Sequence, residues 1–145
     1  MISSKIFELM QIKESKNLIK AREAEIGSPA LSNVEYLECI NNVVKNECLN
    51  NERLQRYEPK YYFVAIASFL YTPRSWMGES FKLGLRDRIA SILGCTPSYV
   101  SNIFRYVTDW YTIYKDFREG VEYLYSKAIR KIEHEQTDTK AGEVL

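Results

Sequence analysis

The sequence predicts an all-α protein of one domain. Apolar residues recur at three- and four-residue spacing along most of its 145 residues, and this spacing lays a stripe along one face of a helix. Glycines and Ser/Thr-Pro pairs separate these segments at positions where helices end and begin. No pair of segments shows the alternation of partnered strands. Nearly half of the residues are apolar, enough for a folded domain with its own core.

Residues 4–25 predict an amphipathic helix that ends at Gly27, since apolar residues alternate there with Lys and Glu. Ser28-Pro29 predicts the start of a second helix, with serine as cap and proline in the first turn. Asparagines are poor helix formers, and five of them between residues 41 and 51 predict that this helix ends before Arg53. We expect residues 1–58 to form an N-terminal arm of two helices.

Glu58-Pro59 marks the next boundary, because a residue before proline avoids helical geometry and proline itself opens a helix well. Residues 61–71 are apolar on all sides, which fits a buried helix or a buried strand. We favour a helix, because no second strand is available as a partner. Thr72-Pro73 repeats the cap-and-proline signal, and Trp76 in the following connector is expected to pack at the edge of the core.

Two short helices joined by a tight turn are predicted within residues 86–105. The first carries apolar residues at three- and four-residue spacing, and Gly94 follows it, where glycine can adopt the left-handed conformation that closes a helix. Thr96 and Pro97 then supply a cap and a first helical residue. Val100 and Ile103 are expected to face inward, while Ala90 is small enough to let the helices cross closely.

The spacing of Ala90, Gly94, Val100 and Ile103 resembles the helix-turn-helix proteins of bacteria and phages of the Cro and lambda-repressor kind. The resemblance covers only about twenty residues. It implies a sequence-specific transcriptional regulator whose second motif helix, about residues 97–106, enters the major groove of double-stranded DNA. The outward residues would be Thr96, Pro97, Ser98, Tyr99, Ser101, Asn102 and Arg105. Asparagine can pair with adenine, arginine with guanine or phosphate, and serine with base edges or phosphate.

Positive charge is concentrated around this motif although the chain has a net charge of only +1. Between residues 72 and 106 five cations face two anions, Glu79 and Asp87. We expect cations beside the motif to steer and anchor DNA: Arg74, Lys82, Arg86 and Arg88. The excess is modest, so one subunit would bind DNA weakly and a homodimer is expected.

A C-terminal packing helix is predicted up to about residue 135, with residues 136–145 as a flexible polar tail. Its apolar positions repeat at Trp110, Val121 and Ile132, an eleven-residue period close to that of a straight helix. Tyr106, Tyr111 and Tyr123 fall outside this stripe. They form an aromatic second face to which we assign dimerisation.

The sequence does not indicate an enzyme, a metal site or a cofactor. The spacing of Cys39, Cys48 and Cys95 matches no zinc pattern, and the single histidine, His134, lies in the charged C-terminal region. Without a twenty-residue apolar run, a cytoplasmic protein with no membrane segment is expected. Two alternatives stay open: a protein-interaction or structural module, such as a phage accessory or virion protein, and an inhibitor of a host protein.

Overall fold

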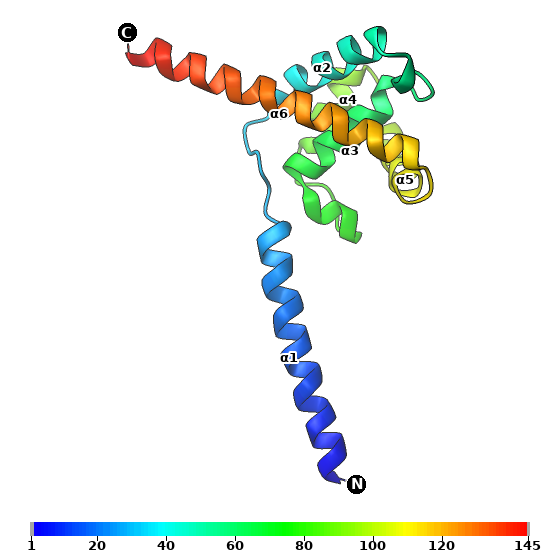
Figure 1. Cartoon of the computed structure of the whole chain (residues 1–145), viewed down its shortest axis with the longest axis vertical. Helices are drawn as coiled ribbons and strands as arrows, with labels where there is room; N and C mark the ends of the chain where they lie inside the picture. Colours follow the sequence, from blue (N-terminus) through cyan, green and yellow to red (C-terminus); the bar gives the residue numbers. More distant parts are fainter. Residues whose placement is uncertain (1, 145) are drawn as a thin grey trace.

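The computed structural model describes the backbone of residues 2–144 and the side chains of residues 2–137. Within that part of the chain it contains six α-helices, two short 3-10 helices and no strand, which confirms the all-α fold class. Most helices form a body, from which α1 and the end of α6 project in different directions (Figure 1). The elements are α1 (Ile2–Ile26), α2 (Tyr36–Asn50), η1 (Glu52–Leu54), α3 (Pro59–Tyr71), η2 (Pro73–Met77), α4 (Leu85–Leu93), α5 (Pro97–Ile113) and α6 (Lys115–Val144).

Helix α3 is the centre of the body. Nine of its thirteen residues are buried, and α2, α5 and α6 all pack against it. A helix surrounded in this way must be apolar on all sides, which explains why the periodicity of residues 61–71 did not distinguish helix from strand. Pro59 is its first residue and Thr72 follows its last, as the two proline signals predicted.

The prediction that Ser28-Pro29 opens the second helix is wrong, because α2 begins only at Tyr36. The Ser28 hydroxyl donates a hydrogen bond backward to the Ala24 carbonyl, at 2.7 Å, and so closes α1. The backbone amides of residues 30 and 31 donate to the Leu70 carbonyl, which holds the segment extended across the end of α3. The prediction that the helix ends before Arg53 is confirmed, since α2 stops at Asn50.

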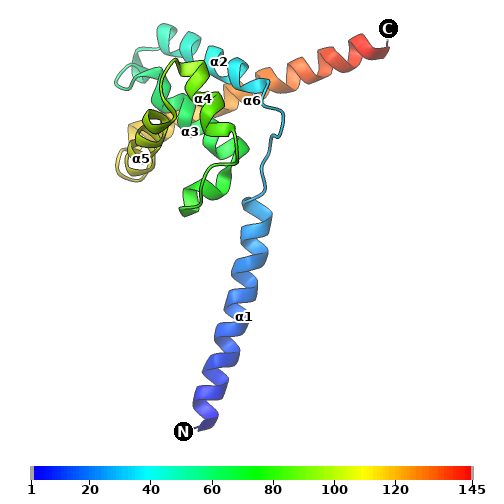
Figure 2. The same cartoon turned by 180° about the vertical axis from the view of Figure 1, so that it is seen from behind.

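The N-terminal arm consists of α1 alone. The predicted boundary at residue 58 is wrong, because α2 packs against α3 and α6 and therefore belongs to the body. Helix α1 ends at Ile26, just before Gly27, as expected, but none of its residues is buried. Figures 1 and 2 show it extending away from the body over most of its length.

The predicted C-terminal packing helix is divided between two helices. Helix α5 continues past the expected end of the motif to Ile113, Tyr114 is extended, and α6 begins at Lys115. The guanidinium of Arg118 donates to the Tyr111 carbonyl, 3.0 Å away, and so satisfies a terminal acceptor of α5 from the first turn of α6. The eleven-residue repeat therefore crosses a break that neither proline nor glycine marks.

The predicted tail is also corrected, since the backbone of residues 136–144 continues α6 as helix. Residue 145 of that predicted tail lies outside the described residues. Gly120, within α6, is buried, and a Cβ added there would lie 2.8 Å from Cε1 of Tyr62. The absence of a side chain at Gly120 lets α6 cross α3 closely.

Candidate nucleic-acid interface

Helices α4 and α5 are joined by the three-residue turn that the sequence predicts. Gly94 adopts the left-handed conformation, with φ 69° and ψ 38°, and the amide of Cys95 donates to the Ala90 carbonyl at 3.0 Å. The hydroxyl of Thr96 accepts from the amide of Tyr99 at 3.2 Å and caps α5. Because a Cβ at the glycine would meet no atom within 4 Å, the backbone conformation alone favours glycine there.

The outward face of α5 is open to solvent. Ala90, Val100 and Ile103 are buried, as predicted, so α5 is held against the body by one side only. Five of the seven predicted contact residues are exposed, and Pro97 and Ser101 are half-buried. The exposed five are Thr96, Ser98, Tyr99, Asn102 and Arg105. Helix α6 does not cover this surface, and Figure 2 shows α5 on the side of the body opposite to the C-terminal end of α6.

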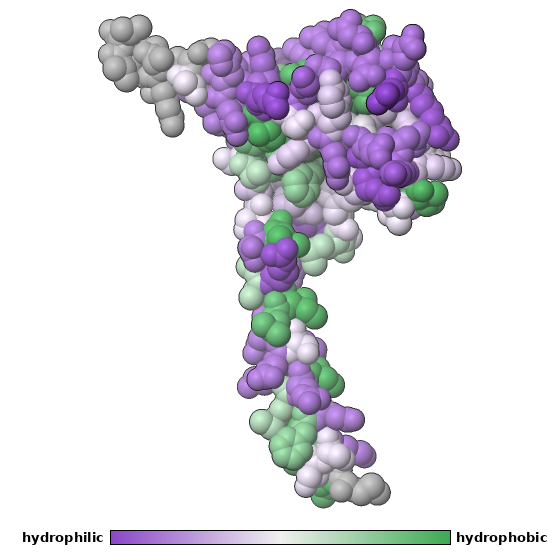
Figure 3. Space-filling view, viewed as in Figure 1, coloured by the Kyte–Doolittle hydropathy of each residue, from purple (hydrophilic) through white to green (hydrophobic). Residues whose placement is uncertain are grey.

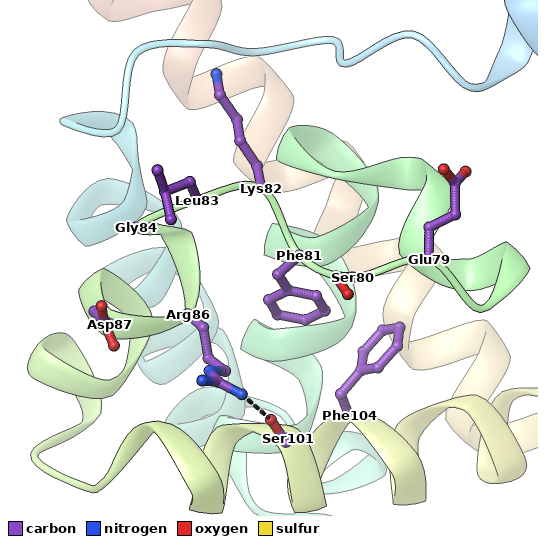
Figure 4. Close-up of a pocket in the computed structure, with 10 residues that line it drawn as sticks. All are labelled: Glu79, Ser80, Phe81, Lys82, Leu83, Gly84, Arg86, Asp87, Ser101 and Phe104. Carbon is purple, nitrogen blue, oxygen red and sulfur yellow. Dashed lines mark hydrogen bonds between the residues drawn. The ribbon is translucent and has the colours of Figure 1, made fainter.

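Ser101 forms a bridge between the two motif helices. Its hydroxyl accepts a hydrogen bond from Nη1 of Arg86 at 3.1 Å, and it lies 3.5 Å from the Pro97 carbonyl, to which it donates. The Arg86 guanidinium is thereby held against α5 (Figure 4). The Ser101 hydroxyl therefore both accepts and donates within the chain, and it positions the Arg86 guanidinium beside α5.

The structure adds a cation that the sequence analysis missed. Nζ of Lys60, at the start of α3, donates to the Tyr99 hydroxyl at 2.6 Å and lies 3.0 Å from a carboxylate oxygen of Glu58. It also lies 5.0 Å from the centre of the Tyr99 ring. The Tyr99 hydroxyl and the Glu58 carboxylate raise the pKa of the Lys60 ammonium, which therefore stays charged at neutral pH. The one sequence signal near Lys60 is its position directly after Pro59, at a predicted helix start.

The four cations predicted to anchor DNA do not share one surface. In Figure 4 Arg86 points toward α5 whereas Lys82 points away from it. Lys82 lines the pocket of about 410 Å³ drawn in Figure 4 together with Arg86 and Ser101, and with Arg88 it also lines a second hollow of about 260 Å³, beside the segment that precedes α2. Arg74 forms an ion pair with Glu23 of α1 at 3.0 Å. Of these four, Arg86 is the one with a described hydrogen bond to a residue of α5.

Trp76 packs at the edge of the core, as expected. Its ring also contacts Tyr111, one of the three tyrosines of the aromatic second face to which dimerisation is assigned. Its ring packs edge-on against Phe104 and Tyr111, each with centroids 5.5 Å apart, and Nε1 donates to the Ser68 hydroxyl. The Tyr123 hydroxyl donates to Glu47 at 3.0 Å. Tyr106, by contrast, is 53% exposed. The proposed dimer face is therefore partly occupied within the chain.

The described residues offer little chemistry outside this surface. No group of three or more His, Cys, Asp or Glu residues among them could hold a metal ion. The three cysteines are free, and burial raises the pKa of the Cys39 and Cys48 thiols, which makes them weak nucleophiles. No helix in this part of the chain is both long enough and apolar enough to span a membrane.

No family model, curated protein or solved structure matches the chain.

Proposed function

We propose that the chain is a sequence-specific DNA-binding transcriptional regulator of the bacterial or phage type, with the N-terminal half of α5 in the major groove. The observation that carries this proposal is the exposed group Ser98, Tyr99, Asn102 and Arg105. Their spacing of one, four and seven residues places them on one face of a helix. That face is polar, projects from the body and begins at a helix N-terminus, where backbone amides attract phosphate.

Each side chain has a distinct task in this proposal. The Asn102 amide is suited to a bidentate contact with adenine, and Arg105 to a backbone phosphate. Ser98 and Tyr99 would contact base edges, while Thr96, at the helix cap, lies where a phosphate would approach. Arg86, hydrogen-bonded to Ser101, adds positive charge to this end of the helix, whereas Lys60 is paired with Glu58 and holds the Tyr99 hydroxyl in place.

Two substitutions test the proposal. Fragments selected from random DNA by the full chain supply a specific site, and binding is then measured by fluorescence anisotropy at several salt concentrations. Asn102→Ala should remove discrimination between that site and random DNA and leave the fold intact. Arg105→Ala should weaken binding to all DNA and reduce the slope of log affinity against log salt by about one.

Matched controls are available far from α5. Asn46 on α2 and Arg130 on α6 are exposed, so Asn46→Ala and Arg130→Ala repeat the same chemical changes outside the surface. Both controls should bind DNA like the unaltered chain. If all four variants give unchanged binding curves, or if no DNA is retained at low salt, the proposal fails.

A protein-interaction or structural role is the second candidate, and a specific observation favours it. A hollow of about 420 Å³ opens between α3, η2 and α6 and is lined mainly by apolar side chains, including Phe69, Trp76 and Tyr125. Such a surface suits a protein partner. A host protein that the chain inhibits would be one such partner. Salt-dependent retention on heparin would favour DNA, whereas copurification with a stoichiometric partner would favour this alternative.

A further inference from the structure

Helix α1 carries large apolar side chains on several of its sides, and no other element among the described residues buries them. Nine large apolar side chains on it are each at least half exposed, and they alternate with hydrophilic side chains along its length (Figure 3). They are Ile2, Ile6, Phe7, Leu9, Met10, Ile12, Leu18, Ile19 and Ile26. A helix normally derives most of its stability from packing one face against other structure. The exposed apolar side chains of α1 therefore favour binding to a partner.

Five of these residues follow a seven-residue repeat. Ile2 and Leu9 occupy one position of a heptad, and Ile12, Ile19 and Ile26 occupy the position three residues later. Together these two positions form the seam along which helices pair in a coiled coil. The remaining seam residues are charged: Lys5, Lys16 and Glu23. Ile6 flanks the seam, and Phe7, Met10 and Leu18 lie on the outer face.

We propose that α1 pairs with α1 of a second copy of this chain, in the antiparallel orientation. With the two helices fully overlapped, each seam residue faces one seam residue of the second copy. The two residue numbers of every facing pair add up to 28. The facing pairs are then Ile2 with Ile26, Lys5 with Glu23, Leu9 with Ile19, and Ile12 with Lys16, and each occurs twice. Every apolar seam residue except Ile12 meets another, and the Lys16 stem can lie along Ile12 while its ammonium reaches water.

The seam charges select this orientation. A parallel pair in register would place Lys5, Lys16 and Glu23 each against its own copy, three layers of like charge. The antiparallel pair instead places Lys5 opposite Glu23 of the second copy, and on the flank it places Glu8 near Arg22. Lys13 then meets its own copy, but on the solvent-exposed flank, where such contacts are weak.

The intramolecular contacts of α1 are compatible with this pairing. Glu23 accepts from Arg74 at the end of α1 nearest the body, and its second oxygen can accept from Lys5 of the other copy. The 25-residue length of α1 places the two copies of Ile26 about 36 Å apart, since a helix rises about 1.5 Å per residue. The two bodies then lie at opposite ends of one rod. This inference does not depend on DNA binding.

Sedimentation equilibrium of the full chain from about 10 to about 300 μM tests the self-association. The unaltered chain should reach a dimer, and Ile19→Asp should weaken dimerisation more than about tenfold because it places a charge opposite Leu9. Leu18→Asp is the matched control, since the adjacent Leu18 is 73% exposed and points away from the seam. A monomer throughout this range, or equal effects of the two variants, overturns the proposal.

Orientation is tested by cross-linking single-cysteine additions with a short bismaleimide. Ser15 lies beside the two-fold axis of the antiparallel pair, so Ser15→Cys should give covalent dimers. Ile2→Cys should not, because its copies lie about 36 Å apart by the helical rise. The reverse result would indicate a parallel pair and would overturn the proposal. The unaltered chain reports the background from its three native cysteines.

A charge reversal gives an independent readout of orientation. Lys5→Glu places two carboxylates opposite each other in the antiparallel pair and should weaken dimerisation about tenfold. In a parallel pair the same change would only exchange one like-charge contact for another. Lys13→Glu is the control, since Lys13 meets its own copy in the antiparallel pair and should leave the dimer almost unchanged. An unchanged dimer in Lys5→Glu contradicts the proposed orientation.

Discussion

Helices α3 and α1 are both rich in apolar residues, yet α3 is largely buried and α1 is exposed. Nine of the thirteen residues of α3 are buried, and none of the twenty-five residues of α1 is. Phe63 of α3 is fully buried, whereas Phe7 of α1 is 66% exposed. The comparison shows that burial depends on whether neighbouring helices enclose a segment, and the number of apolar residues alone does not decide it.

The contacts at the ends of the two helices differ as well. Near the start of α3, Tyr62 stacks on Phe117 of α6 with ring centroids 5.3 Å apart, and its hydroxyl donates to the Leu54 carbonyl. The described polar contact between α1 and the body is the exposed ion pair of Glu23 with Arg74. Exposed ion pairs contribute little to stability. The body should therefore be almost as stable without the apolar residues of α1.

The largest expected effect is at Phe63. Phe63→Ala removes a fully buried ring from the centre of the body and leaves a cavity, so the free energy of unfolding should fall by about 3–5 kcal/mol. Urea denaturation followed by circular dichroism measures the change. A loss below about 1 kcal/mol would mean that α3 is not the centre of the core, and the contrast with α1 would disappear.

A smaller, pH-dependent effect is expected where α6 meets the segment before α3. Asp116 accepts hydrogen bonds from Tyr57 and Arg56, at 2.9 and 2.7 Å. Partial burial opposes the charged form, but these bonds and one from the Phe117 amide outweigh it and lower the pKa of the Asp116 carboxyl. Burial and the bond to Asp116 raise the pKa of Tyr57 to about 12, so the phenol remains a donor at neutral pH.

A carboxyl with a lowered folded-state pKa stabilises the fold above its unfolded pKa of about 4 and loses that contribution as the pH falls through its folded pKa. Asp116→Asn should therefore cost less than about 1 kcal/mol at pH 7, since the pair is partly exposed, and almost nothing near pH 2. Urea denaturation of both proteins at the two pH values measures the difference. An equal cost at both would contradict a role for the carboxylate charge.

Local signals in the sequence predicted most helix boundaries but not their assembly. Gly27, Pro59, Gly94 and Thr96 act through their own backbone or a hydrogen bond to the next turn, so their effects could be inferred from neighbouring residues alone. Ser28 has the same chemistry as Thr96, yet its hydroxyl bonds backward and the following segment is held by the end of α3. That choice depends on a contact distant in sequence.

In the candidate site, too, local sequence predicts some features, and others depend on contacts between residues distant in sequence. The outward residues of α5 follow from helical periodicity, and the structure exposes most of them. Lys60 was missed because it lies 39 residues from Tyr99 in sequence and meets it only in the folded body. Arg74 was grouped with the motif because of its nearness in sequence, but it pairs with Glu23 of α1. Charge counted along a segment does not show where the side chains point.

The smallest expected effect is at Phe7, the exposed phenylalanine of α1 that corresponds to the buried Phe63 of α3. Phe7→Ala removes the same ring from an exposed position on the outer face of α1, and alanine favours the helix by about 0.5 kcal/mol relative to phenylalanine. The free energy of unfolding should therefore change by less than about 0.5 kcal/mol in the denaturation used for Phe63→Ala. A loss above about 1 kcal/mol would show that Phe7 packs against other structure, and α1 could no longer stand as the unenclosed counterpart of α3.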